Sequence, residues 1–123
     1  MDVRAVIDSY YEYANAGDWS RWCDLFAADT VVDEQLAGRV TGADTLRSMM
    51  AGFPDMYASF ANVPVHVLVD GDTAAVVSKL TAVTPGGETI EADVMNYFEL
   101  RGGEISYMSN YHDTAPFRSV LAS

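Results

Sequence analysis

The chain has 123 residues, 50% hydrophobic and 20% charged, which is typical of one globular domain rather than of a disordered or fibrous chain. Seven Lys and Arg against 18 Asp and Glu give a net charge of −11, which repels nucleic-acid phosphates and anionic membrane surfaces. The single cysteine, Cys23, excludes an internal disulfide and a thiolate zinc site. No apolar run is long enough for a membrane span, so we expect one cytoplasmic domain, residues 1–123, with no nucleic-acid or membrane partner.

The first part of the chain has the apolar periodicity of helices. Apolar residues recur at three- and four-residue spacing over residues 2–16, which predicts an amphipathic helix that ends at Gly17. Asp18 is a favourable N-cap for a second helix, whose apolar stripe continues to Phe26.

A β-rich stretch and a third helix follow. Residues 30–35 and 39–41 favour short strands. Thr41 or Asp44 is expected to cap the third helix, and Pro54 disfavours its continuation. The apolar face of this helix is formed by Leu46, Met49, Met50 and Phe53.

From residue 62 onward the hydrophobic period changes to two, which is typical of strands. Turn sequences divide this part into four strands, residues 62–69, 73–84, 89–101 and 104–113. Residues 114–123 are expected to form a loose tail. Helices followed by an antiparallel meander indicate an α+β fold, with a curved sheet around the N-terminal helices.

The loop of the last hairpin decides which polar residues share a face of the sheet. A three-residue loop with a left-handed glycine, a G1 bulge, brings the even positions of both strands together. One wall is then lined by Asn96, Phe98, Met108, Asn110 and His112. A two-residue loop at Gly102-Gly103 instead separates Asn96 from Asn110.

Five short motifs occur in a characteristic order along the chain. They are Asn15-Ala16-Gly17-Asp18-Trp19, Leu25-Phe26-Ala27-Ala28-Asp29, Asp70-Gly71-Asp72, Gly103-Glu104-Ile105 and Tyr111-His112-Asp113. No single motif is specific, but their order and spacing resemble the nuclear-transport-factor-2-like superfamily over roughly residues 5–117. Within it the chain is similar to ketosteroid isomerases, SnoaL-like polyketide cyclases and limonene-type epoxide hydrolases. The resemblance implies a cone-shaped α+β fold, in which a curved antiparallel (mixed) sheet wraps around three N-terminal helices and encloses an apolar pocket.

The resemblance to ketosteroid isomerases also implies catalytic positions. Tyr10 falls where these enzymes place their oxyanion-hole tyrosine, and Glu34 falls where they place the general-base aspartate. Asn96 falls where they place a protonated aspartic acid that hydrogen-bonds the same oxyanion. Glu34 in place of an aspartate can still carry a proton, and Asn96 in place of an aspartic acid can still donate a hydrogen bond. Both replacements change how far the side chain reaches, so steroid specificity does not carry over. The resemblance favours the three-residue loop in the last hairpin.

The other two branches differ from this chain at their catalytic positions. Epoxide hydrolases carry an arginine and an aspartate where this chain has Ser78 and Leu80, and their second aspartate matches Asn110. Relative to SnoaL-like cyclases, Asn110 and Asn96 replace an acid and a histidine. That comparison leaves Glu34 or His112 to move a proton.

Glu34 is the predicted general base. Strand alternation puts it on the opposite face from Asp33, and a carboxylate in an apolar pocket has its pKa raised toward neutrality. The alternative is that Glu34 is a surface acid. The buried hydroxyl of Tyr10 needs a partner, either a substrate oxygen or another side chain, and a slip of one residue would select Tyr11 instead.

The remaining predicted site residues have structural alternatives. Asn96 and Asn110 either bind a ligand or satisfy sheet backbone, and His112 is either an acid–base group or structural. Trp22, Phe53 and Met50 are predicted to line a pocket for a flat apolar ligand, with ordinary helix-to-sheet packing as the alternative.

The leading hypothesis is a cofactor-independent, metal-independent enzyme that moves a proton next to a carbonyl of a small hydrophobic, polycyclic substrate. Enone isomerisation and aldol-type cyclisation both pass through an enolate, which an oxyanion hole stabilises. The alternatives are a non-catalytic binder of hydrophobic ligands and a water-using hydrolase or dehydratase that employs His112 and Glu34. Met95 and Tyr97 on the outer face of the sheet predict a homodimer.

Overall fold

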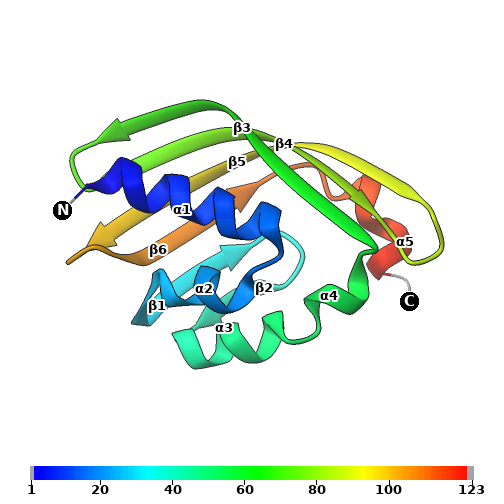
Figure 1. Ribbon diagram of the computed structural model, residues 1–123, viewed down its shortest axis with the longest axis horizontal. Coiled ribbons are helices and arrows are strands. Elements are labelled where there is room, and N and C mark those ends of the chain that lie inside the picture. Colours follow the sequence, from blue (N-terminus) through cyan, green and yellow to red (C-terminus); the bar gives the residue numbers. More distant parts are fainter. Residues whose placement is uncertain (1, 122–123) are drawn as a thin grey trace.

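A curved six-stranded sheet forms one side of the molecule, and the N-terminal helices pack against its concave face (Figure 1). The computed structural model describes residues 2–121. The strands are β1 (Phe26–Glu34), β2 (Gly38–Thr41), β3 (Ser59–Asp70), β4 (Thr73–Val83), β5 (Thr89–Arg101) and β6 (Glu104–Tyr111). The helices are α1 (Val3–Ala16), α2 (Trp19–Asp24), α3 (Ala43–Met50), α4 (Phe53–Met56), η1 (Ala115–Phe117) and α5 (Arg118–Leu121).

The strand order is β2-β1-β6-β5-β4-β3, and β1 pairs with β6 in parallel while the other pairs are antiparallel. This order brings the N-terminal strand β1 next to the C-terminal strand β6, so both ends of the chain contribute to one wall. The predicted α+β class and the mixed curved sheet are confirmed. Within residues 2–121, no helix is long and apolar enough to cross a bilayer.

The first helix ends at the predicted residue and begins one residue later than predicted, at Val3. The Asp2 side chain accepts a hydrogen bond from the Ala5 N–H, and Gly17 ends the helix with φ +70°. Asp18 caps α2 as predicted, by accepting from the Arg21 N–H. The prediction that the second helix reaches Phe26 is wrong, because Phe26 pairs with Ile105 and thereby begins strand β1.

The third helix begins at neither predicted cap. Gly42 precedes α3 with φ +91°, a conformation that favours glycine, and its N–H donates to the Thr30 carbonyl at 2.8 Å. The helix stops at Met50, before Pro54, but Phe53 and Pro54 open a separate short helix, α4. Proline is tolerated there because the first turn needs no N–H from it.

In the hairpin of β5 and β6, the predicted side chains share one face of the sheet, but the loop is shorter than predicted. Arg101 pairs with Glu104, so Gly102 and Gly103 form a two-residue loop, and both have positive φ. An irregularity at Ser106, between the Leu100–Ile105 and Glu99–Tyr107 pairs, then shifts the register by one residue. Asn96 therefore still lies opposite Asn110, and Phe98 opposite Met108.

The C-terminal segment is not a loose tail over the residues that the structure describes. Residues 115–121 form η1 and α5, and Phe117 is buried in a small apolar cluster with Tyr57, Ala82 and Ile90. The expectation failed because Phe117 is buried in this cluster and Val120 packs against it, which docks the segment on the sheet. Residues 122 and 123 lie outside the described part of the chain.

The two faces of the sheet differ in burial. The concave face and α1 form the main core, with Ile7, Val76 and Phe98 fully buried. Strands β3 to β6 leave large apolar side chains exposed, namely Val63, Val65, Leu68, Val69, Val77, Met95 and Tyr111.

Candidate active site

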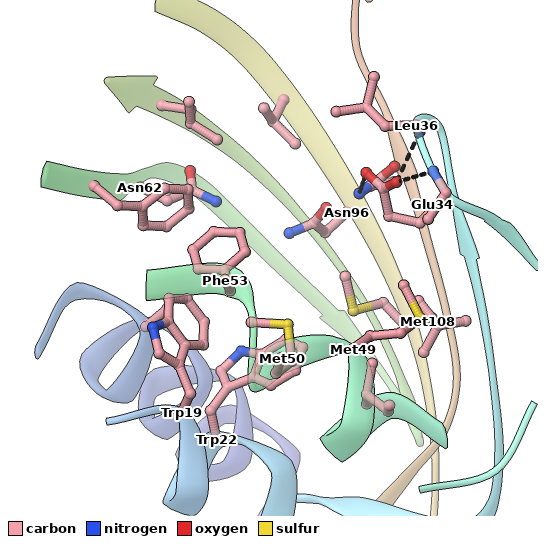
Figure 2. Close-up of a pocket in the computed structure, with 18 of the residues that line it drawn as sticks. Trp19, Trp22, Glu34, Leu36, Met49, Met50, Phe53, Asn62, Asn96 and Met108 are labelled. Carbon is pink, nitrogen blue, oxygen red and sulfur yellow. Dashed lines mark hydrogen bonds between the residues drawn. The ribbon is translucent and has the colours of Figure 1, made fainter. Parts of the chain in front are cut away.

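A cavity of about 340 Å³ lies between the concave face of the sheet and the helices (Figure 2). From the helices it is lined by Tyr10, Ala14, Trp19, Trp22, Leu46, Met49, Met50, Phe53 and Met56, with Phe117 from η1. From strands and loops it is lined by Val32, Glu34, Leu36, Ala37, Val40, Tyr57, Phe60, Asn62, Leu80, Val94, Asn96, Met108, Asn110 and His112. Among the described residues that line the cavity, Glu34 is the only acid, and none is a Lys or Arg.

The structure brings nine of the ten predicted site residues to this cavity. They are Tyr10, Trp22, Glu34, Met50, Phe53, Asn96, Met108, Asn110 and His112. Phe98 does not line it, which corrects the prediction for that residue. Its ring is fully buried and packs edge-on against the Tyr10 ring, 5.0 Å between centroids, so Phe98 belongs to the core behind the cavity.

The Glu34 carboxylate lies at the end of β1 and is held by the turn that follows it. Its Oε2 accepts hydrogen bonds from the Leu36 N–H at 2.7 Å and the Ala37 N–H at 2.5 Å. Its Oε1 accepts from Asn110 Nδ2 at 3.3 Å. Asn110 in turn accepts the Gln35 N–H on its Oδ1 at 2.9 Å, so one amide ties β6 to both the carboxylate and the turn.

The expectation that the pKa of Glu34 lies above its ordinary value is wrong. Burial does raise it, but the interactions with His112, the Ala37 N–H, Asn110 and the Leu36 N–H together lower the pKa below its ordinary value. Each of these groups stabilises the charged form. Glu34 is therefore an anion at neutral pH and, alone, a weak base.

His112 faces this carboxylate. Its Nδ1 lies 2.9 Å from the Asp113 carbonyl oxygen, which can only accept, so Nδ1 carries a proton. Its Nε2 lies 3.9 Å from Glu34 Oε1, and the imidazole side chain is only 5% exposed. The pKa of His112 is raised, chiefly by the Glu34 carboxylate and against the effect of burial. His112 therefore keeps its proton to higher pH than a free imidazole does.

Two adjacent tyrosines share the buried face of α1 but have different environments. Tyr11 accepts a hydrogen bond from Asn96 Nδ2 at 2.9 Å, and burial raises its pKa to about 12. Tyr10 lines the cavity, and burial raises its pKa well above the ordinary value, with Tyr11 and Glu34 adding to the effect. The bond to Tyr11 uses one of the two N–H groups of the Asn96 amide, so the sharing of one oxyanion by Tyr10 and Asn96 stays a prediction that depends on the second N–H.

Several buried polar atoms in the lining have no hydrogen-bond partner among the described residues. They are Trp22 Nε1, Asn62 Oδ1 and Asn96 Oδ1. The Trp22 indole N–H lies near the Tyr10 hydroxyl and opposes the rise in its pKa, but does not reach hydrogen-bond geometry. Buried polar groups without partners are uncommon in native proteins, so these atoms mark positions where a bound molecule can supply one.

Sequence analysis missed Asn62, Leu36 and Phe117 as lining residues. Asn62 is a polar residue at an inward position of a strand, and this position could have indicated that it lines the cavity. The alternation along β3 hid it, because the register shifts between Pro64 and His66. Leu36 lies in a turn and Phe117 in the expected tail, where no periodicity assigns a direction.

The polar groups of the cavity allow acid–base chemistry in an apolar surrounding. A protonatable imidazole faces a carboxylate at one end, and the Tyr10 phenol remains a neutral donor. Across the cavity, Trp19, Trp22 and Met50 lie opposite Asn62, Asn96 and Glu34 (Figure 2). No group of three His, Cys, Asp or Glu side chains comes together in residues 2–121.

This architecture, a curved sheet closed by N-terminal helices over an apolar cavity, is that of an NTF2-like domain. A sequence profile of the SnoaL-like domain matches residues 7–108, and the chain therefore belongs to the SnoaL-like domain family. No protein of curated function matches the sequence significantly.

Solved structures share the fold at low sequence identity. An NTF2-like protein of unknown function from Burkholderia pseudomallei is 15% identical, with a TM-score of 0.89 and full coverage of both chains. A candidate polyketide cyclase from Xanthomonas campestris is 21% identical, with a TM-score of 0.85, covering 97% of this chain and 96% of the other. IdmH from Streptomyces antibioticus, also a candidate polyketide cyclase, is 16% identical, with a TM-score of 0.81 and full coverage of both.

Proposed function

We propose that this protein catalyses proton transfer next to a carbonyl in a small hydrophobic, polycyclic ketone, through an enolate and without a cofactor. Isomerisation of an enone and aldol-type cyclisation are both reactions of this kind. The observation that carries the proposal is the Glu34–His112 pair at the polar end of an otherwise apolar cavity. Membership of the SnoaL-like family and the shared fold with two candidate polyketide cyclases support it.

Within the pair, His112 is the proton acceptor and Glu34 its anionic partner. The pKa of His112 is raised and that of Glu34 is lowered, so the imidazole is the more basic of the two groups and the better proton acceptor. The Asp113 carbonyl holds the proton on Nδ1, which leaves Nε2 as the basic atom. Glu34 then stabilises the imidazolium that forms, because opposite charges attract strongly in a poorly solvated site.

The proton balance of the step is simple. A C–H bond next to the carbonyl breaks, its proton moves to His112 Nε2, and its electron pair passes to the carbonyl oxygen as an enolate. The Tyr10 hydroxyl, neutral because its pKa is raised, donates a hydrogen bond to that oxygen. Isomerisation returns the proton from His112 to another carbon. In cyclisation the enolate carbon forms a C–C bond to a second carbonyl, and the alkoxide that results takes the proton back from His112.

The test is deuterium uptake from heavy water into bicyclic and polycyclic ketones and enones. We expect uptake with the wild type, loss of roughly 10²- to 10⁴-fold in His112→Gln, and a smaller loss in Glu34→Gln with ligand binding retained. His66→Gln is the matched control, because His66 is the other histidine and is exposed on β3. Uptake that persists in His112→Gln contradicts the assignment of the base.

Two other outcomes point to different functions. A ketone that binds without any uptake indicates a non-catalytic binder, which the fully hydrogen-bonded Glu34 carboxylate also permits. Incorporation of solvent oxygen, or loss of water from a β-hydroxy ketone, indicates a water-using enzyme. The water-using enzyme is the second candidate function. His112 Nε2 lies 3.9 Å from Glu34 Oε1, so the two groups can act together as an acid and a base on a water molecule.

A further inference from the structure

The cavity has a second polar position, remote from the Glu34–His112 pair. Asn62 lies on the edge strand β3, whereas Glu34 lies on β1. Three strands separate them, and the middle one, β5, carries Asn96. Figure 2 shows the same order, with Asn62 and Glu34 on opposite sides and Asn96 between them.

Asn62 is fixed in place through its backbone. Its N–H donates to Asn15 Oδ1 at 2.6 Å, and Asn15 Nδ2 donates to its carbonyl oxygen at 2.8 Å. Because β3 is an edge strand, backbone groups that face away from β4 have no neighbouring strand. The Asn15 side chain satisfies two of them. The backbone bonds therefore fix the position of Asn62, and its side-chain amide takes no part in them.

The amide of Asn62 is buried and incompletely bonded. The residue is only 6% exposed, lines the cavity, and its Oδ1 has no hydrogen-bond partner among residues 2–121. A buried oxygen in this state is unfavourable unless a bound group donates to it. An apolar residue at this position would avoid that cost, so the amide is best explained by a ligand.

We propose that Asn62 Oδ1 accepts a hydrogen bond from a hydroxyl group of the substrate, at the end remote from the reacting carbonyl. This inference rests on the proposed function, which places the carbonyl beside Tyr10 and His112. A cavity lining with one acid and no Lys or Arg does not compensate a carboxylate or a phosphate. The substrate class is therefore an uncharged, flat fused-ring ketone with a distal hydroxyl.

The first test varies the ligand and leaves the protein unchanged. Binding of 2-acetylnaphthalene, its 6-hydroxy derivative and its 6-methoxy derivative is measured by isothermal titration calorimetry. The hydroxyl can donate to Asn62 Oδ1, whereas the methoxy group cannot. We expect the hydroxy ketone to bind roughly 3- to 10-fold more tightly than either other ligand, as one net hydrogen bond provides.

The second test varies the protein. Asn62→Leu keeps the size of the side chain and removes the acceptor, so the three ligands should bind it with equal affinity. Val63→Ala is the control, because Val63 is adjacent and exposed, and this variant should keep the preference. If Asn62→Leu does not fold, the wild-type ligand series still decides, since it depends on no variant.

Three results overturn the proposal: equal binding of the three ligands to the wild type, a preference that survives in Asn62→Leu, or no binding of any of them. Deuterium uptake into the acetyl group of the same ligands separates this proposal from the proposed function. A hydroxyl preference without uptake refutes proton transfer and keeps the role of Asn62. Uptake without the preference refutes Asn62 alone.

Discussion

Replacing the neighbouring tyrosines Tyr10 and Tyr11 by phenylalanine should separate catalysis from stability. Both rings are buried on the same helix face, so each substitution removes one buried hydroxyl and leaves the packing of the ring unchanged. Only the Tyr11 hydroxyl is bonded by Asn96. We expect Tyr11→Phe to destabilise the fold and Tyr10→Phe to slow proton transfer.

The magnitudes follow from the contacts of each hydroxyl. Tyr11→Phe removes the acceptor of the 2.9 Å bond and leaves a buried Asn96 N–H unpaired, which costs about 1–3 kcal/mol of unfolding free energy. Tyr10→Phe removes only the weak approach of the Trp22 indole, so the loss of stability should stay below about 1 kcal/mol. If Tyr10 donates to the enolate oxygen, its loss should slow the reaction roughly 10²- to 10³-fold, as for other oxyanion donors.

Urea unfolding followed by tryptophan fluorescence measures the first quantity, and deuterium uptake into a bound ketone measures the second. The reasoning is refuted if Tyr10→Phe is the more destabilising substitution, or if Tyr11→Phe slows uptake more than Tyr10→Phe does.

Three further predictions concern the acid–base pair, the outer face of the sheet and the C-terminal turn. Deuterium uptake should rise as pH increases through the raised pKa of His112, because the neutral imidazole is the proposed base. In Glu34→Gln this rise should occur at lower pH, since no carboxylate then favours the imidazolium. The wild type should sediment as a dimer of the 13.4 kDa chain, and Met95→Asp, which puts a charge among the exposed apolar side chains, should shift it to the monomer. Phe117→Ala should cost about 3–4 kcal/mol of unfolding free energy in urea, as expected for a buried ring.

Each of these has a result that contradicts it. An unchanged pH profile in Glu34→Gln would show that the carboxylate does not set the pKa of His112. A monomeric wild type would exclude the dimer, and a dimeric Met95→Asp would place its interface elsewhere. A loss below about 1 kcal/mol in Phe117→Ala would mean that the ring contributes little to the core, since a buried ring normally contributes several times more.

The fold could be predicted from the sequence where local chemistry dictates the backbone. Gly17 ends α1 and Asp18 caps α2 through their own conformational preferences and hydrogen bonds, and the structure confirms both predictions. The prediction that the second helix reaches Phe26 failed, because Phe26 pairs with Ile105, almost 80 residues away, and this pairing overrides the helical pattern. The last hairpin shows a different limit: two errors, in loop length and in the irregularity at Ser106, cancelled and left the face correct.

The site could be predicted as a set of residues but not as a set of interactions. Family resemblance and strand alternation were enough to place Glu34, Asn96 and His112 on one cavity wall. Neither reveals that the turn after Glu34 folds back and donates two N–H groups to the carboxylate. Together with His112 and Asn110, those bonds lower the pKa of Glu34 despite its burial, so in the proposed mechanism Glu34 is the partner of the base and not the base.

Glu34 therefore has two roles that depend on the same negative charge. Through Oε2 it holds the turn that places Leu36 and Ala37 in the cavity wall, and through Oε1 it faces His112. A carboxylate that only closed a turn would not need to face an imidazole, and one that only acted as a base would lose basicity by accepting two backbone N–H groups. The arrangement is consistent if the base is His112, because the same bonds that weaken Glu34 as a base keep it ionised, and an ionised Glu34 is what raises the pKa of His112.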